Sequence, residues 1–167
     1  MLSSSLFILK SFAEKGNALW AWFYVIAGQL FMTLAVALQN VDFGFMEIGI
    51  YYSGISVAAI VGAICLIKIH RIDNDINLRD YHGYIYEKPQ LGLVFLISCL
   101  GLIGLPFTPT FIGIDLLFNH IHKRHLLLVL FTSLGFLFME LAILRVYARI
   151  FMGLYKKADH AIAFRSS

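Results

Sequence analysis

Long apolar segments alternate with short polar segments along the chain, and this pattern predicts membrane-spanning helices. Apolar residues dominate four stretches, at 18–38, 48–69, 90–120 and 126–153. A helix that crosses the hydrocarbon core of a bilayer needs about 20 mainly apolar residues, and every one of these stretches reaches that length. We therefore predict an all-α integral membrane fold with about four transmembrane helices.

The third apolar stretch contains residues that interrupt a helix. Pro106 and Pro109 lie in its middle, next to Gly104 and Gly113. Proline has no N–H to donate, and its ring clashes with the preceding turn. We therefore predict that the third transmembrane helix is broken at Gly104–Pro109. Interrupted membrane helices commonly form ion or substrate sites, so this stretch is a candidate for ion transport.

The segments outside the four stretches are more polar. We divide the chain into an N-terminal segment (1–17), a four-helix membrane domain (18–155) and a basic tail (156–167). In the first segment, an apolar stripe runs beside charged residues, which fits both a short interfacial helix and a frayed terminus. The stripe consists of Leu6, Phe7, Leu9 and Phe12.

Composition supports the membrane assignment and excludes an ordinary soluble domain. The chain is 60% hydrophobic and 14% charged, whereas soluble domains are about 45–50% apolar and about 25% charged. The net charge of +3 is modest and lies in loops and termini, so we expect no nucleic-acid partner.

The distribution of Lys and Arg predicts the orientation in the membrane. With four crossings, the two termini and the polar loop 68–89 share one side, which holds most of the Lys and Arg. Only Lys123 and Arg124 lie on the other side. The positive-inside rule then places both termini in the cytoplasm. We expect the membrane to be the bacterial inner membrane.

Small residues in the second predicted span are candidates for close helix packing. Gly54, Ala58 and Gly62 recur every four residues, so they form a stripe on one helix face where a neighbouring helix can approach closely.

Asp115, Glu140 and Arg145 are charged residues inside predicted spans, where charge is costly and often functional. Two interpretations stay open. In the first, the carboxylates relay protons, because a low-dielectric environment favours their protonated form. In the second, Glu140 is tied structurally to Arg145 or to another subunit.

Metal, haem and independent catalysis are not indicated. All six histidines lie at span ends, in loops or in the tail, and the NHIHKRH loop has no Cys or carboxylate beside its histidines. Cys65 and Cys99 lie in apolar runs and are predicted to be core residues. We expect no metal and no cofactor, and no enzyme activity by the chain alone.

The stretch GLPFTPTFIGIDLL, at Gly104–Leu117, resembles the broken-helix motif of antiporter-like membrane subunits. That family includes subunits of respiratory complex I, Mrp cation–proton antiporters and membrane-bound hydrogenases. The resemblance extends over residues 18–155 and covers the C-terminal part of such a protein. It implies an antiporter-type fold, other membrane subunits as partners and a place in a complex that translocates protons or cations, including a proton-pumping oxidoreductase.

The sequence also departs from the family motif. The family usually has a Lys, sometimes a Glu, directly after F-x-G, whereas Gly113 is followed here by Ile114 and only then by Asp115. A shift of one residue turns a side chain by about 100° around a helix.

The leading hypothesis is that the chain contributes an outer half-channel to an ion-translocating complex. The alternative is a non-conducting scaffold subunit with a degenerate channel.

Overall fold

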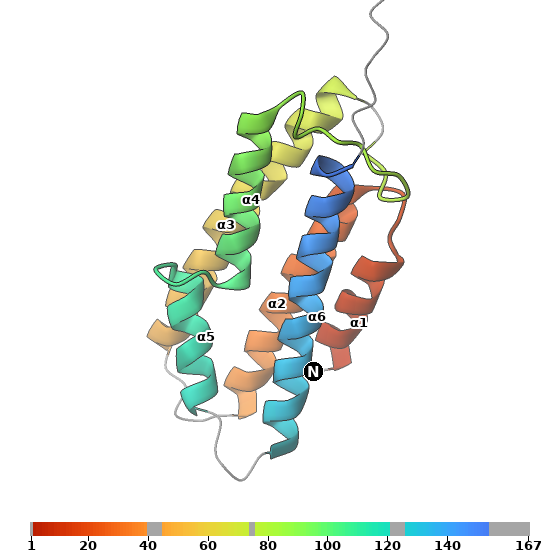
Figure 1. Ribbon diagram of the computed structural model, residues 1–167. Helices are drawn as coiled ribbons and strands as arrows, with labels where there is room; N and C mark the ends of the chain where they lie inside the picture. The colour runs from red at the N-terminus through yellow and green to blue at the C-terminus, as the bar shows by residue number, and fades with distance from the viewer. Residues whose placement is uncertain (1, 40–44, 74–75, 121–125, 154–167) are drawn as a thin grey trace, which may run out of the picture.

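In the part of the chain that it describes, the computed structural model of the protein is a bundle of six helices (Figure 1). It describes residues 2–39, 45–73, 76–120 and 126–153, and the statements below refer to these residues. The helices are α1 (Leu2–Ala13), α2 (Ala18–Gln39), α3 (Phe45–Ile72), α4 (Pro89–Ile103), α5 (Pro109–His120) and α6 (Leu126–Phe151). The described residues contain no strand, which confirms the predicted all-α class.

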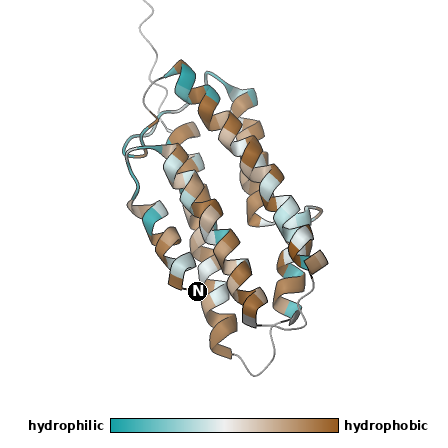
Figure 2. Ribbon diagram, turned by 180° about the vertical axis from the view of Figure 1, so that it is seen from behind, coloured by the Kyte–Doolittle hydropathy of each residue, from teal (hydrophilic) through white to brown (hydrophobic). Residues whose placement is uncertain are grey.

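Three of the helices are long and apolar enough to cross a membrane: α2, α3 and α6. They contain 22, 28 and 26 residues, or about 33, 42 and 39 Å at 1.5 Å per residue, against a hydrocarbon core of about 30 Å. Hydrophobic residues dominate along the helices, and hydrophilic residues gather toward one end of the bundle (Figure 2). Three of the predicted spans are thereby confirmed as candidates, while the third predicted stretch contains the shorter helices α4 and α5.

The N-terminal segment forms α1, which packs along α2 and α6. Its inner face is built on serine: Ser4 Oγ donates to the Gly28 carbonyl at 2.8 Å, and Ser11 Oγ donates to the Ala21 carbonyl at 3.1 Å. Leu6, in contrast, is 65% exposed. The predicted apolar stripe therefore does not face the bundle as a unit, because small hydroxyl side chains allow a closer approach between helices than leucines do.

The small residues of α3 lie against α4 and α5. A Cβ added to Gly54 would lie 2.5 Å from the backbone nitrogen of Thr110 in α5. One turn further on, the Ala58 carbonyl accepts a hydrogen bond from Ser98 Oγ of α4 at 2.6 Å. A Cβ on Gly62 would lie 2.6 Å from the same Ser98 oxygen. The side-chain-free surface of α3 thus sets how closely both shorter helices approach it.

Trp22 connects α2 to the same contact region. Its ring lies where a Cβ of Gly62 would be, and its indole N–H donates to the Ala59 carbonyl at 3.1 Å. The ring also packs against Phe95 of α4, with 5.0 Å between centroids. Because a buried tryptophan needs a partner for its N–H, the absent side chain at Gly62 fixes both the position and the hydrogen bond of this ring.

The polar segment between α3 and α4 is tied to the ends of other helices. The Ile76 carbonyl accepts from the N–H of Ala18, and the N–H of Leu78 donates to the Lys15 carbonyl. Both Ile76 and Leu78 are buried. The N–H of His82 donates to the Arg149 carbonyl at the end of α6. This segment therefore closes one end of the bundle instead of extending into solvent.

Candidate functional site

The helix α4 ends in a left-handed turn at Gly104. The residue has φ +92°, and the N–H groups of Gly104 and Leu105 both donate to the Leu100 carbonyl, at 3.1 and 2.9 Å. A left-handed residue after the last helical turn is a common helix end and favours glycine. Phe107 follows with φ +84° and a fully exposed side chain, at 101%.

The next helix begins directly after this turn. Pro109 is the first residue of α5, where its missing N–H would have had no helical partner. Thr108 precedes it and accepts from the N–H of Phe111 through both its carbonyl, at 3.1 Å, and its Oγ1, at 3.3 Å. Regular helix is therefore absent at 104–108. Gly104 terminates α4 at one side of this segment, and Thr108 and Pro109 begin α5 at the other side.

Buried polar side chains from three helices surround this interruption. Gln29 of α2 donates from Nε2 to the Leu102 carbonyl, in the last turn of α4, at 2.9 Å. This hydrogen bond joins α2 to α4. Thr33 donates to the Gln29 carbonyl at 3.1 Å. Buried polar atoms without a hydrogen-bond partner also occur among the described residues: Gln29 Oε1, Tyr51 OH, Thr110 Oγ1, Thr132 Oγ1 and His70 Nδ1.

Tyr51 and Thr110 lie on the two helices that pack beside the interruption. Tyr51 is fully buried, and a Cβ added to Gly113 of α5 would lie 2.5 Å from the Cβ of Tyr51. Thr110, also fully buried, contacts Gly54 one turn along α3. Buried polar atoms of this kind are usually satisfied by internal water. The segment between α4 and α5 is thus bordered by buried polar groups without a hydrogen-bond partner among the described residues.

Glu140 lies on the face of α6 that is directed toward α4 and α5. Residues four and seven apart share one helix face, so Phe136, Glu140 and Tyr147 lie on the same side of α6. Phe136 packs against Phe118 of α5, with 5.9 Å between centroids, and Tyr147 stacks on Phe95 of α4, with 6.4 Å. Because Glu140 lies between these two contacts along α6, it is level with the interruption between α4 and α5.

The Glu140 side chain is half-buried. No hydrogen bond or ion pair joins its carboxylate to another residue in the described part of the chain.

Arg145 has different partners from those considered in the sequence. Its Nη1 donates to the Ser11 carbonyl at 3.0 Å and its Nη2 donates to the Glu14 carbonyl at 3.1 Å. The guanidinium thereby satisfies carbonyls at the C-terminal end of α1, where a cation is favoured by the helix dipole. Arg145 holds α1 on α6 and is not bonded to Glu140.

Asp115 lies on the exposed side of α5. Its Oδ2 accepts from Asn119 Nδ2, one turn further along the same helix, at 3.2 Å. Gly113 and Leu117, in contrast, are buried. Glu140 thus lies at the level of the interruption along α6, and Asp115 lies on the outer surface of the bundle.

Sequence reasoning did not single out Tyr51 and Thr110. Their burial depends on how α3 and α5 are rotated against each other, and only the glycines at 54 and 113 carried a signal of that contact. Cys65 and Cys99 are free and buried, as predicted. The described residues contain no group of three or more metal-ligating side chains, and residues 121–125 of the histidine-rich loop lie outside them.

Comparison with known proteins assigns the chain to a family. Residues 20–139 match the family described as "NADH:quinone oxidoreductase/Mrp antiporter, TM". The chain belongs to this family. The match begins in the first turn of α2, includes α3, α4 and α5, and ends within α6 at Met139, one residue before Glu140.

Individual relatives are subunits of NADH-quinone oxidoreductases. Subunit N of Desulforamulus reducens is 29% identical over 133 residues, covering 78% of this chain and 26% of the relative. Subunit N of Blochmanniella floridana is 31% identical over 94 residues (52% and 19%), and subunit M of Rickettsia conorii is 31% identical over 77 residues (46% and 16%). The aligned part thus spans about a quarter or less of these relatives, and no solved structure matches the chain.

Proposed function

We propose that this chain is a membrane subunit of a multi-subunit complex that translocates protons or other cations, and that it supplies the helices found near the C-terminus of antiporter-like subunits. Family membership and three candidate spans support this proposal. Several relatives are named as subunits of NADH-quinone oxidoreductases, so the partners we propose are other membrane subunits of such a complex.

We infer that α4 and α5 together form a fourth crossing. With 15 and 12 residues, the helices are about 22 and 18 Å long, so each alone is shorter than a hydrocarbon core of about 30 Å. Both pack on α3, and they follow one another along its length (Figure 1). Four crossings place both termini on one side, which the positive-inside rule assigns to the cytoplasm of a bacterial cell.

The position of Glu140 opposite the interruption carries the proposal of a proton path. A membrane carboxylate that faces a bundle interior is a common element of proton relays. Hydroxyl and amide groups of Tyr51, Thr110 and Gln29 border the same interruption without complete hydrogen bonding. Water held by these groups would connect Glu140 to them, and protons would pass between the carboxylate and this water. Asp115, which is exposed on this chain, stays a second candidate where a neighbouring subunit covers it.

The test is proton translocation by the assembled complex with Glu140→Gln. Inverted membrane vesicles are energised, and the initial rate of pH-gradient formation is followed with a fluorescent pH indicator. We expect the rate to fall at least about tenfold, because the loss of a proton-transferring group commonly lowers a rate by about 10² or more. The control is Asp80→Asn, which removes the same charge from an exposed position outside the spans.

The alternative function is a scaffold, and the replacement of the family's lysine position by Ile114 favours it. On that account the small residues of α3 only hold the helices together. An unchanged pumping rate in Glu140→Gln and in Asp115→Asn, with normal amounts of assembled complex, would remove both carboxylates from the mechanism and establish the scaffold.

A further inference from the structure

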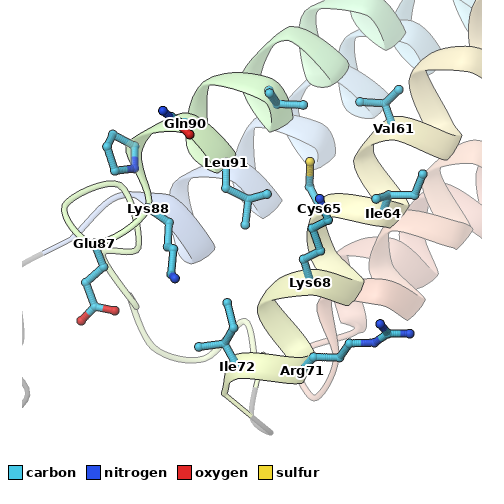
Figure 3. A pocket seen from close by; sticks show the side chains of 12 residues that line it. Val61, Ile64, Cys65, Lys68, Arg71, Ile72, Glu87, Lys88, Gln90 and Leu91 are labelled. Atoms are coloured by element: carbon cyan, nitrogen blue, oxygen red, sulfur yellow. The ribbon is translucent and has the colours of Figure 1, made fainter.

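A pocket of about 840 Å³ opens between the C-terminal half of α3 and the start of α4 (Figure 3). It lies away from the interruption, near the end of the bundle where hydrophilic residues gather. The side chains that line it are mainly of two kinds, cationic and aliphatic. One wall of the pocket is formed by α3, and the other by the start of α4 and the residues before it.

Both walls change from charged to apolar in the same direction. On α3, Lys68 is near the helix end, while Ile64 and Val61 lie one and two turns earlier. On the opposite wall, Lys88 precedes α4, and Val94 lies more than one turn into that helix. Since α3 and α4 are consecutive helices that run in opposite directions (Figure 1), the two lysines lie toward one end of the pocket, beside Ile72, and Ile64, Val61 and Val94 lie toward the other.

The charged end has an excess of cations. Lys68, Arg71 and Lys88 line it together with one acid, Glu87. Figure 3 shows the Lys88 side chain extending toward Ile72, across the pocket, whereas the Glu87 carboxylate is directed away from its centre. The three cationic side chains make no hydrogen bond or ion pair within the described part of the chain. An anion at this end would therefore meet cationic donors that have no other hydrogen-bond partner among the described residues, and it would offset their mutual repulsion.

We propose that this pocket binds an anionic phospholipid, with the headgroup phosphate between Lys68 and Lys88 and an acyl chain along Ile64, Val61 and Val94. A free phosphate would use only the charged end and would leave the apolar walls in contact with water. A neutral lipid would leave the excess positive charge uncompensated. An anionic phospholipid matches both ends in the right order, and basic pockets on the cytoplasmic side of membrane helices suit such headgroups.

Lipid retention by the full chain in a mild detergent tests the proposal. Native mass spectrometry counts the phosphatidylglycerol or phosphatidylcholine molecules that stay bound when both lipids carry the same acyl chains. We expect one tightly bound phosphatidylglycerol and a preference over phosphatidylcholine. Lys68→Gln with Lys88→Gln should weaken phosphatidylglycerol binding roughly 10- to 30-fold, given the attraction expected for two cations near an anionic headgroup. Both lysines are exposed, so folding should be unaffected.

A charge control distinguishes this pocket from general attraction between a basic surface and an anionic lipid. Lys10→Gln with Lys15→Gln removes the same charge from exposed positions outside the pocket and should leave retention unchanged. An equal loss of retention in this control would mean that surface charge alone holds the lipid, and it would overturn the proposal.

A second variant distinguishes a lipid site from a site for free phosphate. Val94→Trp should displace the acyl chain and lower phosphatidylglycerol retention at least about tenfold, because its bulky ring would occupy the apolar end of the pocket. If retention persists in Val94→Trp while millimolar inorganic phosphate removes the lipid, only the charged end binds, and the proposal of a lipid site is overturned.

Discussion

Replacement of Gly113 by alanine tests the close contact between α3 and α5 on which the geometry of the interruption depends. A Cβ at this position would lie 2.5 Å from Tyr51 Cβ and 2.7 Å from Tyr51 Cα. The backbone of α3 cannot move aside as a flexible side chain would, so the two helices must separate or tilt. Overpacking of this kind costs about 1–3 kcal/mol.

Gly49→Ala is the matched control, because nothing lies within 4 Å of a Cβ there. Both glycines are helical, and alanine improves helix propensity by up to about 1 kcal/mol at each. The difference between the two variants therefore isolates the steric cost of about 1–3 kcal/mol. Thermal unfolding of the purified chain in detergent should show Gly113→Ala melting roughly 2–12 °C below Gly49→Ala, at about 2–4 °C per kcal/mol for a chain of this size.

Equal melting temperatures for Gly113→Ala and Gly49→Ala would refute the reasoning. That result would mean that α5 does not approach α3 at Tyr51, and that the polar groups at positions 51 and 110 are not held together. A melting temperature lowered equally in both variants would indicate a general intolerance of alanine in these helices and would also count against the contact.

Three other substitutions test further parts of the structure. Arg145→Gln should destabilise the attachment of α1 by about 1.5–3 kcal/mol, because charged hydrogen bonds to two carbonyls are lost; hydrogen exchange of the α1 amides should accelerate at least about tenfold, and unchanged exchange would contradict the cap. Ser4→Ala should lower the melting temperature by roughly 2–4 °C, for a lost hydrogen bond of about 1 kcal/mol, while the exposed Ser3→Ala should not. Phe107→Gly should stabilise the isolated chain by about 1 kcal/mol, since it relieves a left-handed backbone and removes a ring that is fully exposed; a lower melting temperature would show that the ring contributes packing.

The lengths of the apolar runs were sufficient to predict α2, α3 and α6, because burial of the backbone in a bilayer requires long continuous helices. The direction in which charged side chains point was not predictable. Asp115 and Glu140 both lie inside predicted spans, yet the contact between Gly113 and Tyr51 turns Asp115 outward.

Arg145 illustrates the same limit from another side. Its partners are carbonyls of α1, separated from it by more than 130 positions. Pairing rules along a helix describe only residues three or four apart. Glu140 is five positions from Arg145 and falls outside these rules, and Ser11 and Glu14 belong to a distant part of the chain that the rules do not reach. The serine face of α1 was missed for a related reason, since hydroxyl groups that bond to a neighbouring helix are polar in the sequence and buried in the structure.

The most direct test of the central claim is the composition of the complex that contains this chain. The tagged chain is purified from its native membrane in a gentle detergent, and the proteins that accompany it are quantified by mass spectrometry. The account predicts stoichiometric membrane subunits of an NADH-quinone oxidoreductase or of a cation–proton antiporter. A chain that purifies alone, or with unrelated proteins, would contradict a role in an ion-translocating complex.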